Sequence, residues 1–165
     1  LLMAPSGINK GQIAPTQLVI VDEQQNVIDG KGRASAETTL HIEIIKKLKC
    51  SAVLHTHSIY ATVLSDHFEK QAAIRLEGWE MLKGIKGISS HETSINIPIV
   101  ANNQNMKELS RVVYTYLNSN IPGILVAGHG LYAWGDSLAE AQRHVEILEF
   151  LLSAVWHKQL LPPVR

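Results

Sequence analysis

The segment GILVAGHGLYAW (residues 123–134) consists of two apolar runs on either side of a Gly-His-Gly turn. Short apolar runs bounded by glycines are typical of buried strands, and a tight turn between them favours an antiparallel hairpin. A second local hairpin is expected where QLVIVD (17–22) precedes a polar turn and Val27–Ile28. Helical segments lie between the strands, so the sequence predicts a mixed α/β sandwich and not a purely parallel sheet.

Three further segments have helical spacing of their apolar residues. They cover residues 38–48, residues 106–117 after a capping Asn105, and a long run that opens with the capping box Ser137-x-x-Glu140. Residues 51–56 are predicted to form a buried strand that leads into a short helix over 59–65. INIPIV (95–100) alternates like a strand, but Pro98 cannot donate a ladder hydrogen bond, which favours a sheet edge.

Composition excludes several classes of function. The chain has 165 residues, and 15 basic side chains balance 15 acidic ones, so no basic stripe indicates nucleic acid or an anionic membrane. The apolar run FLLSAVW (150–156) is too short to span a bilayer. Cys50 is the only cysteine, which excludes an internal disulfide and fits a reducing compartment, so we expect a cytoplasmic protein.

The chain contains no repeat and no Pro/Gly-rich linker, which predicts one domain over residues 1–165. The start LLMAPSG has no charged region followed by a long apolar region, so it is not a signal peptide. It resembles the interior of a domain, as though the natural N-terminus were missing.

VLHTHS (53–58) supplies the first chemical signal. Because side chains alternate along a strand, His55 and His57 project from the same face and can chelate one ion. His129, framed by two glycines, is the candidate third ligand, and three imidazoles with one open position suit a catalytic zinc. The alternative, that these are core or surface histidines with ordinary hydrogen bonds, stays open at this point.

Two glutamates are candidates for acid/base chemistry. Glu80 lies between Trp79 and Met81, and burial there would raise its pKa toward the range of a general acid/base. Glu37 precedes a predicted helix. The plainer interpretations are a solvated helix-face carboxylate for Glu80 and a carboxylate favoured by the helix dipole for Glu37.

Two loops of small residues could hold an anion. One contains Ser6 and Gly7, with Lys10 nearby, and the other contains Ser35 and Ala36 just before a helix. Each loop alone is weak evidence, since such dipeptides are mostly turns. Residue chemistry therefore predicts metal-assisted chemistry on an anionic small molecule.

Four motifs occur together in a defined order: PSG (5–7), SAET (35–38), VLHTHS (53–58) and GHGLYAWG (128–135). In this order they resemble the zinc-dependent class II aldolase family over nearly the whole chain. Within that family, EMLKGI (80–85) and GHGLYAWG are most similar to the branch of methylthioribulose-1-phosphate dehydratases of methionine salvage.

The resemblance implies an α/β/α sandwich around a central, mixed, largely antiparallel sheet. It implies one zinc ion per subunit, bound by His55, His57 and His129, and a homotetramer with active sites near subunit contacts. A sugar-phosphate substrate would be held by Ser6, Gly7 and Ser35. The family has a preceding helix and loop that this sequence lacks.

The resemblance also leaves two reactions open. In the dehydratase branch the acid/base is the glutamate matching Glu80, and in the aldolases it is the glutamate matching Glu37. Because the flanking residues of Glu80 match the dehydratases, dehydration is the preferred interpretation, and an aldolase or epimerase is the alternative. A third possibility is an interaction protein that has kept the fold without the chemistry, but such a scaffold has no need for three converging histidines.

Overall fold

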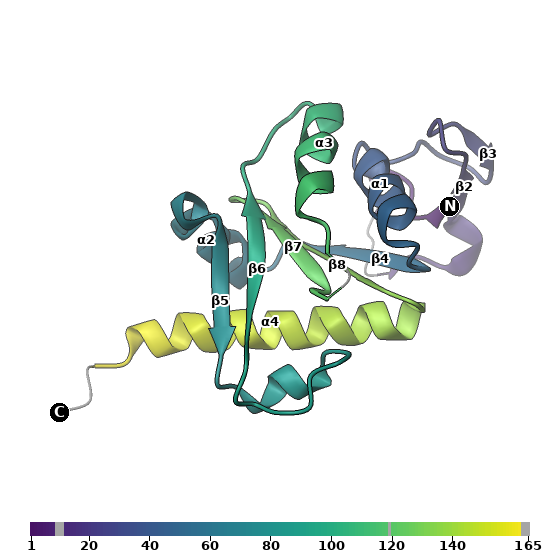
Figure 1. Cartoon of the computed structure of the whole chain (residues 1–165). Helices are drawn as coiled ribbons and strands as arrows, with labels where there is room; N and C mark the ends of the chain where they lie inside the picture. Colours follow the sequence, from purple (N-terminus) through teal and green to yellow (C-terminus); the bar gives the residue numbers. More distant parts are fainter. Residues whose placement is uncertain (9–11, 119, 163–165) are drawn as a thin grey trace.

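The computed structural model describes residues 1–8, 12–118 and 120–162. It contains a central sheet of five strands, which Figure 1 shows between layers of helices. Its strand order is β4-β8-β7-β6-β5, and only the β6–β7 pair is parallel. The strands are β4 (Ala52–Thr56), β5 (Ala73–Glu77), β6 (Ser94–Val100), β7 (Gly123–Val126) and β8 (Gly130–Gly135). The mixed, largely antiparallel sheet that the family resemblance implied is confirmed.

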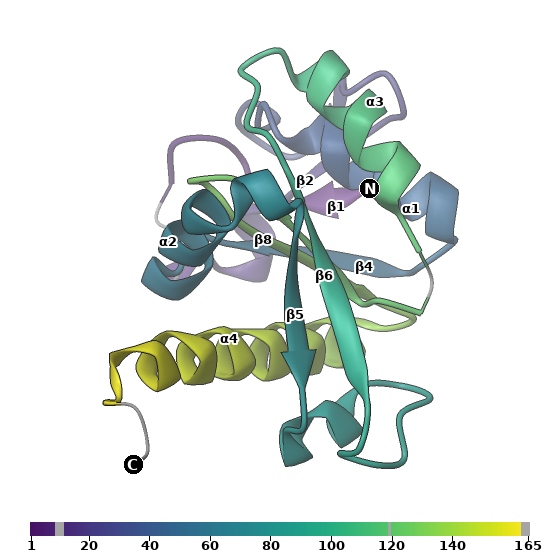
Figure 2. The same ribbon diagram turned by 60° about the vertical axis from the view of Figure 1, so that its left-hand side comes forward.

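Helices cover both faces of this sheet. α1 (Thr38–Leu48) and α3 (Met106–Tyr116) pack on one face, and α2 (Ile59–His67) and α4 (Leu138–Leu160) on the other. Figures 1 and 2 show α4 running along one side of the sheet while α1 and α3 lie together on the opposite side. The predicted α/β/α sandwich is therefore confirmed.

Successive side chains of β7 and β8 point to opposite faces of the sheet and so join two different layers of the core. Leu125 and Leu131 join the core beneath α2 and α4, whereas Ile124, Tyr132 and Trp134 join the core beneath α1 and α3. Because both faces are buried, these strands are apolar throughout, with every residue of β7 and β8 buried. That pattern is why GILVA and LYAW read as continuous apolar runs in the sequence.

A small antiparallel sheet stands beside α1. It consists of β1 (Leu2–Met3), β2 (Val19–Val21) and β3 (Val27–Asp29), so the hairpin expected after residue 17 is confirmed. Among the described residues, the structure also contains the 3-10 turns η2 (Pro15–Gln17), η3 (Glu69–Gln71) and η4 (Glu80–Gly84). The small sheet is tied to the main body by the Thr38 hydroxyl, which lies 3.0 Å from the Met3 sulfur.

The expectation that Pro98 marks a sheet edge is wrong. β6 lies between β5 and β7, and Pro98 pairs with Ala73 of β5. Pairing with β7 begins only at Ile99, so no ladder bond from the proline nitrogen is required. β5, which carries Arg75 and Glu77 on its exposed face, was not predicted at all.

No helix in the described part of the chain is long and apolar enough to cross a membrane, as the short apolar run at 150–156 indicated.

Candidate metal centre

Three histidines converge at one end of the central sheet. The Nε2 atom of His55 lies 2.6 Å from that of His57 and 3.3 Å from that of His129, and the last two are 3.0 Å apart. In a tetrahedral zinc site with bonds of about 2.0–2.1 Å, nitrogen ligands stand about 3.3 Å from one another. The predicted grouping of the three imidazoles is therefore what the structure contains.

Hydrogen bonding orients the most buried ring. His55 Nδ1 donates to the carbonyl oxygen of Leu131 at 2.9 Å, which turns the Nε2 atom toward the other two rings. Burial, and then the neighbouring His55, lower the pKa of His129, which favours the neutral ring that a metal requires. Neutral rings aimed at one point repel through their lone pairs unless a cation lies between them, so the donor set fits a divalent ion.

Glu37 completes the group. Its Oε1 atom lies 3.3 Å from His129 Nε2, 3.5 Å from His55 Nε2 and 3.9 Å from His57 Nε2. One ligand atom from each of these four residues falls within 4.8 Å of all the others. Glu37 is the N-cap residue of α1, and its carbonyl oxygen accepts from Leu40 N, so its backbone is fixed at the start of this helix.

Two glycines make the His129 turn possible. Gly128 has φ +61°, a left-handed conformation that glycine adopts without strain. Gly130 leaves no room for a larger residue, because a Cβ there would meet the carbonyl oxygen of Thr56 at 2.1 Å. Two hydroxyl groups of α2 fix the turn. Thr62 donates to the His129 carbonyl at 3.2 Å, and Ser65 Oγ accepts from Gly128 N at 3.1 Å.

Tyr132 lies directly against the metal group, and sequence reasoning missed it. Its ring stacks on His55 with centroids 3.9 Å apart and an interplanar angle of 16°. The side chain is fully buried, and burial raises the pKa of its hydroxyl, with Glu37 adding to the effect. Position alone could have indicated it, since Tyr132 pairs with His55 across the two strands.

Glu80 does not belong to this group. It opens η4 with a side chain that is 69% exposed, and it forms ion pairs with Lys83 and with His91. The expectation that burial raises its pKa is wrong, because the hydrogen bond from Lys83 holds the pKa of Glu80 below its usual value. Leu82 is the buried residue of η4, and the neighbouring Met81 is 39% exposed.

The two candidate anion loops lie side by side. Ser6 N donates to the carbonyl oxygen of Arg33 at 2.8 Å, which joins the loop of Ser6 and Gly7 to the chain leading into Ser35. Ser35 Oγ accepts from Glu37 N at 3.3 Å, so the second loop is continuous with the metal group. Lys10 lies outside the described residues.

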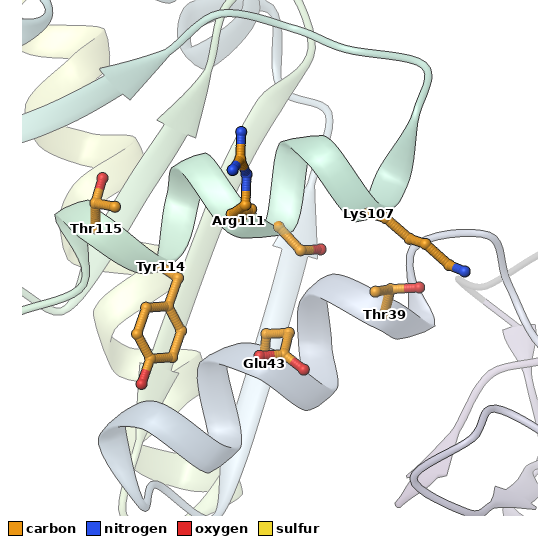
Figure 3. A pocket seen from close by; sticks show the side chains of 7 residues that line it. Thr39, Glu43, Lys107, Arg111, Tyr114 and Thr115 are labelled. Carbon is orange, nitrogen blue, oxygen red and sulfur yellow. The ribbon is translucent and has the colours of Figure 1, made fainter.

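A separate groove of about 500 Å³ runs between α1 and α3 (Figure 3). Glu43 of α1 and Tyr114 of α3 face it, and Lys47 lies over the Tyr114 ring at 4.4 Å. It shares no lining residue with the metal group, and no motif in the sequence indicated it.

Comparison with known proteins places this geometry in a family. A family model described as Class II Aldolase and Adducin N-terminal domain matches residues 1–156. The chain therefore belongs to the class II aldolase and adducin N-terminal domain family, as its four motifs indicated.

Two similar proteins are both methylthioribulose-1-phosphate dehydratases. The chain is 43% identical over 149 residues to a methylthioribulose-1-phosphate dehydratase of Stenotrophomonas maltophilia, covering 89% of this chain and 70% of that protein. It is 41% identical over 151 residues to the same enzyme of Hahella chejuensis, covering 90% of this chain and 73% of the relative.

The fold is also that of solved family members. The L-fuculose-1-phosphate aldolase of Thermus thermophilus superposes with a TM-score of 0.75 at 24% identity, covering 96% of this chain and 78% of that one. At that identity the likeness concerns the fold alone.

Proposed function

We propose that this chain is a zinc-dependent hydro-lyase that dehydrates methylthioribulose 1-phosphate to a diketo-methylthiopentyl phosphate in methionine salvage. The proposal rests on one observation above all: three imidazole Nε2 atoms and the Glu37 carboxylate converge on one point in a chain 43% identical to such dehydratases. An interaction scaffold without chemistry is disfavoured by the same convergence.

His55, His57 and His129 would hold the zinc, with Glu37 beside them. When bound, zinc supplies Lewis acidity that stabilises negative charge developing on the substrate carbonyl oxygen. The buried His55 and the more exposed His57, with side-chain exposures of 5% and 58%, leave the group open on one side. A substrate oxygen would enter from that side.

The chain must then move one proton and release one water. A carboxylate takes the proton from C3 of the ketose phosphate, and the electron pair of that C–H bond first places negative charge on the C2 carbonyl oxygen and then forms the double bond between C3 and C4. The C4–oxygen bond breaks, and the hydroxyl leaves as water after taking up a proton from the same acid. The resulting enol ketonises, so atoms and charge balance without any oxidant.

Glu80 is the proposed acid/base. Its support is the similarity of EMLKGI to the dehydratase branch, together with an exposed side chain that its ion pair with Lys83 keeps ionised. Because Glu80 lies outside the metal group of its own chain, we propose that it reaches the substrate in a homotetramer, near subunit contacts. Exposed apolar side chains on α2 and α4, among them Ile59 and Phe150, support such contacts.

The phosphate is proposed to bind at the paired loops of Ser6, Gly7 and Ser35. Support comes from the hydrogen bond between Ser6 and Arg33 and from the proximity of Ser35 to Glu37. One unit spanning residues 1–165 and a cytoplasmic location complete the proposal, supported by a family match over residues 1–156 and by the single buried Cys50.

One specific observation favours a second reaction. Glu37, not Glu80, is the carboxylate within 3.3 Å of a candidate ligand nitrogen. With Glu37 as acid/base, the chain would be an aldolase or epimerase acting on a sugar phosphate.

The direct test incubates the zinc-loaded protein with methylthioribulose 1-phosphate and follows products by mass spectrometry. Loss of one water with appearance of the diketone supports the dehydratase. Two smaller fragments, the products of retro-aldol cleavage, identify the aldolase. A zinc-free protein with no turnover under any loading condition contradicts both reactions.

A mixed-subunit experiment tests where Glu80 acts. Co-assembled H129A and E80Q chains would regain activity only if one active site takes its histidine and its Glu80 from different chains. Each variant assembled alone is the control. Native mass spectrometry of the wild-type protein checks the proposed tetramer, and a monomer at assay concentration would contradict the shared site.

A further inference from the structure

Glu149, on the inner side of α4, holds the metal-binding segment from behind. Its Oε1 atom accepts a hydrogen bond from the Thr56 hydroxyl at 2.5 Å, and its Oε2 atom accepts one from the Ser58 hydroxyl. Both carboxylate oxygens are therefore used, one for each residue that flanks His57. A carboxylate that accepts from two hydroxyl groups holds both of their residues to one side chain.

Strand geometry places this carboxylate opposite the metal. Side chains alternate along β4, so Thr56 projects to the face away from His55 and His57. Glu149 contacts β4 on that opposite face, through Thr56, whereas the imidazoles converge on the metal-facing side. The contact thus fixes the backbone at His57 without touching the metal group itself.

The Ser58 hydroxyl extends the contact into α2. It donates to Glu149 and accepts from Ala61 N at 3.0 Å, which makes Ser58 the N-cap of α2. One carboxylate therefore joins α4, the end of β4 and the start of α2. His57 lies between the two anchored residues, and with a side-chain exposure of 58% it is the ligand least confined by packing.

We infer that Glu149 is a positioning residue for the metal centre, which it serves by holding the two neighbours of His57 so that the ring faces His55 and His129. The inference rests on the proposed metal centre and not on the identity of the substrate. In metal sites, partners that orient the ligands typically contribute about 10–100-fold to metal affinity, and this contact would act one step further out, through the backbone.

The test measures Co²⁺ binding by the full chain, because the visible spectrum of Co²⁺ reports the geometry of its ligands. Glu149→Gln keeps only one acceptor oxygen and is expected to weaken Co²⁺ affinity about tenfold or more and to alter the spectrum. Thr56→Val, which keeps the branched shape and removes one hydroxyl, should shift both readouts in the same direction. Thr56→Ser keeps the hydroxyl and should restore them.

Glu146→Gln is the matched control, since Glu146 lies one turn earlier on α4 and bonds only to Gln142 in the described contacts. It should bind Co²⁺ as the wild type does. Wild-type affinity and spectrum in both E149Q and T56V would overturn the inference, as would a lower melting temperature with unchanged Co²⁺ binding. If E149Q fails to fold, T56V and T56S decide alone.

The same data separate this inference from the proposed reaction. Wild-type protein that takes up no Co²⁺ would overturn the metal centre and the role of Glu149 together. The expected Co²⁺ results in a protein that does not dehydrate methylthioribulose 1-phosphate would support Glu149 while rejecting the substrate.

Discussion

The ring of Tyr132 stacks on the imidazole of His55, with centroids 3.9 Å apart and planes 16° from parallel. The two residues pair directly across β4 and β8. The stack holds the His55 ring from one side while the Leu131 carbonyl holds its Nδ1 atom, so the most buried ligand is fixed in both tilt and tautomer.

Tyr132→Phe should fold as stably as the wild type, within about 1 kcal/mol, because its buried hydroxyl has no hydrogen-bond partner in the described structure. Tyr132→Ala should lose about 3–5 kcal/mol, since it removes a fully buried ring. Urea unfolding of the metal-free proteins measures both changes. A Phe variant as unstable as the Ala variant would show that the hydroxyl has a partner after all.

The roles of the two glutamates separate by substitution. Glu37→Gln should weaken zinc affinity, by about 10–100-fold, and excess zinc should restore turnover. Glu80→Gln should bind zinc normally and lose about 10²–10⁴-fold in kcat, the usual contribution of a general acid/base. Zinc titration and steady-state kinetics on both variants provide the measurement.

Normal turnover by Glu80→Gln would remove Glu80 from the mechanism. Loss of rate in Glu37→Gln at saturating zinc would then assign the proton transfer to Glu37 and favour the aldolase interpretation. Glu92→Gln is a suitable control for charge removal, because Glu92 lies in the loop that follows η4 and has no assigned role.

How far the sequence could predict this site depends on the range of the interactions involved. His55 and His57 share a face through the local period of a strand, and the helix over 38–48 follows from apolar spacing, so both were predictable. The surroundings of Glu80 were not, because an apolar neighbour in sequence does not bury a side chain that points outward. Glu149 was equally hidden, since only the packing of α4 brings it to Thr56.

The close approach at Gly130 yields a prediction about backbone space. Gly130→Ala should destabilise the protein by about 1–3 kcal/mol or more and reduce zinc uptake, because its Cβ would push the Thr56 carbonyl away, beside the His55 ring. Gly78 is the matched control: it has φ +72°, but a Cβ added there would meet no atom within 4 Å. Gly78→Ala should cost about 1–2 kcal/mol of backbone strain and leave zinc uptake unchanged. Equal zinc loss in both variants would contradict a local effect.

The ion pair between Lys83 and Glu80 gives a pH prediction with a defined sign. The hydrogen bond from Lys83 lowers the pKa of Glu80, so Lys83→Met should let that pKa rise toward its ordinary value. A base must be ionised to accept a proton, so the acid limb of the kcat/KM profile should move to higher pH in Lys83→Met. His91→Ala should move it the same way by less, since the charge of His91 is a smaller cause of the shift. An acid limb that stays in place in both variants would mean that the group it reports is not Glu80.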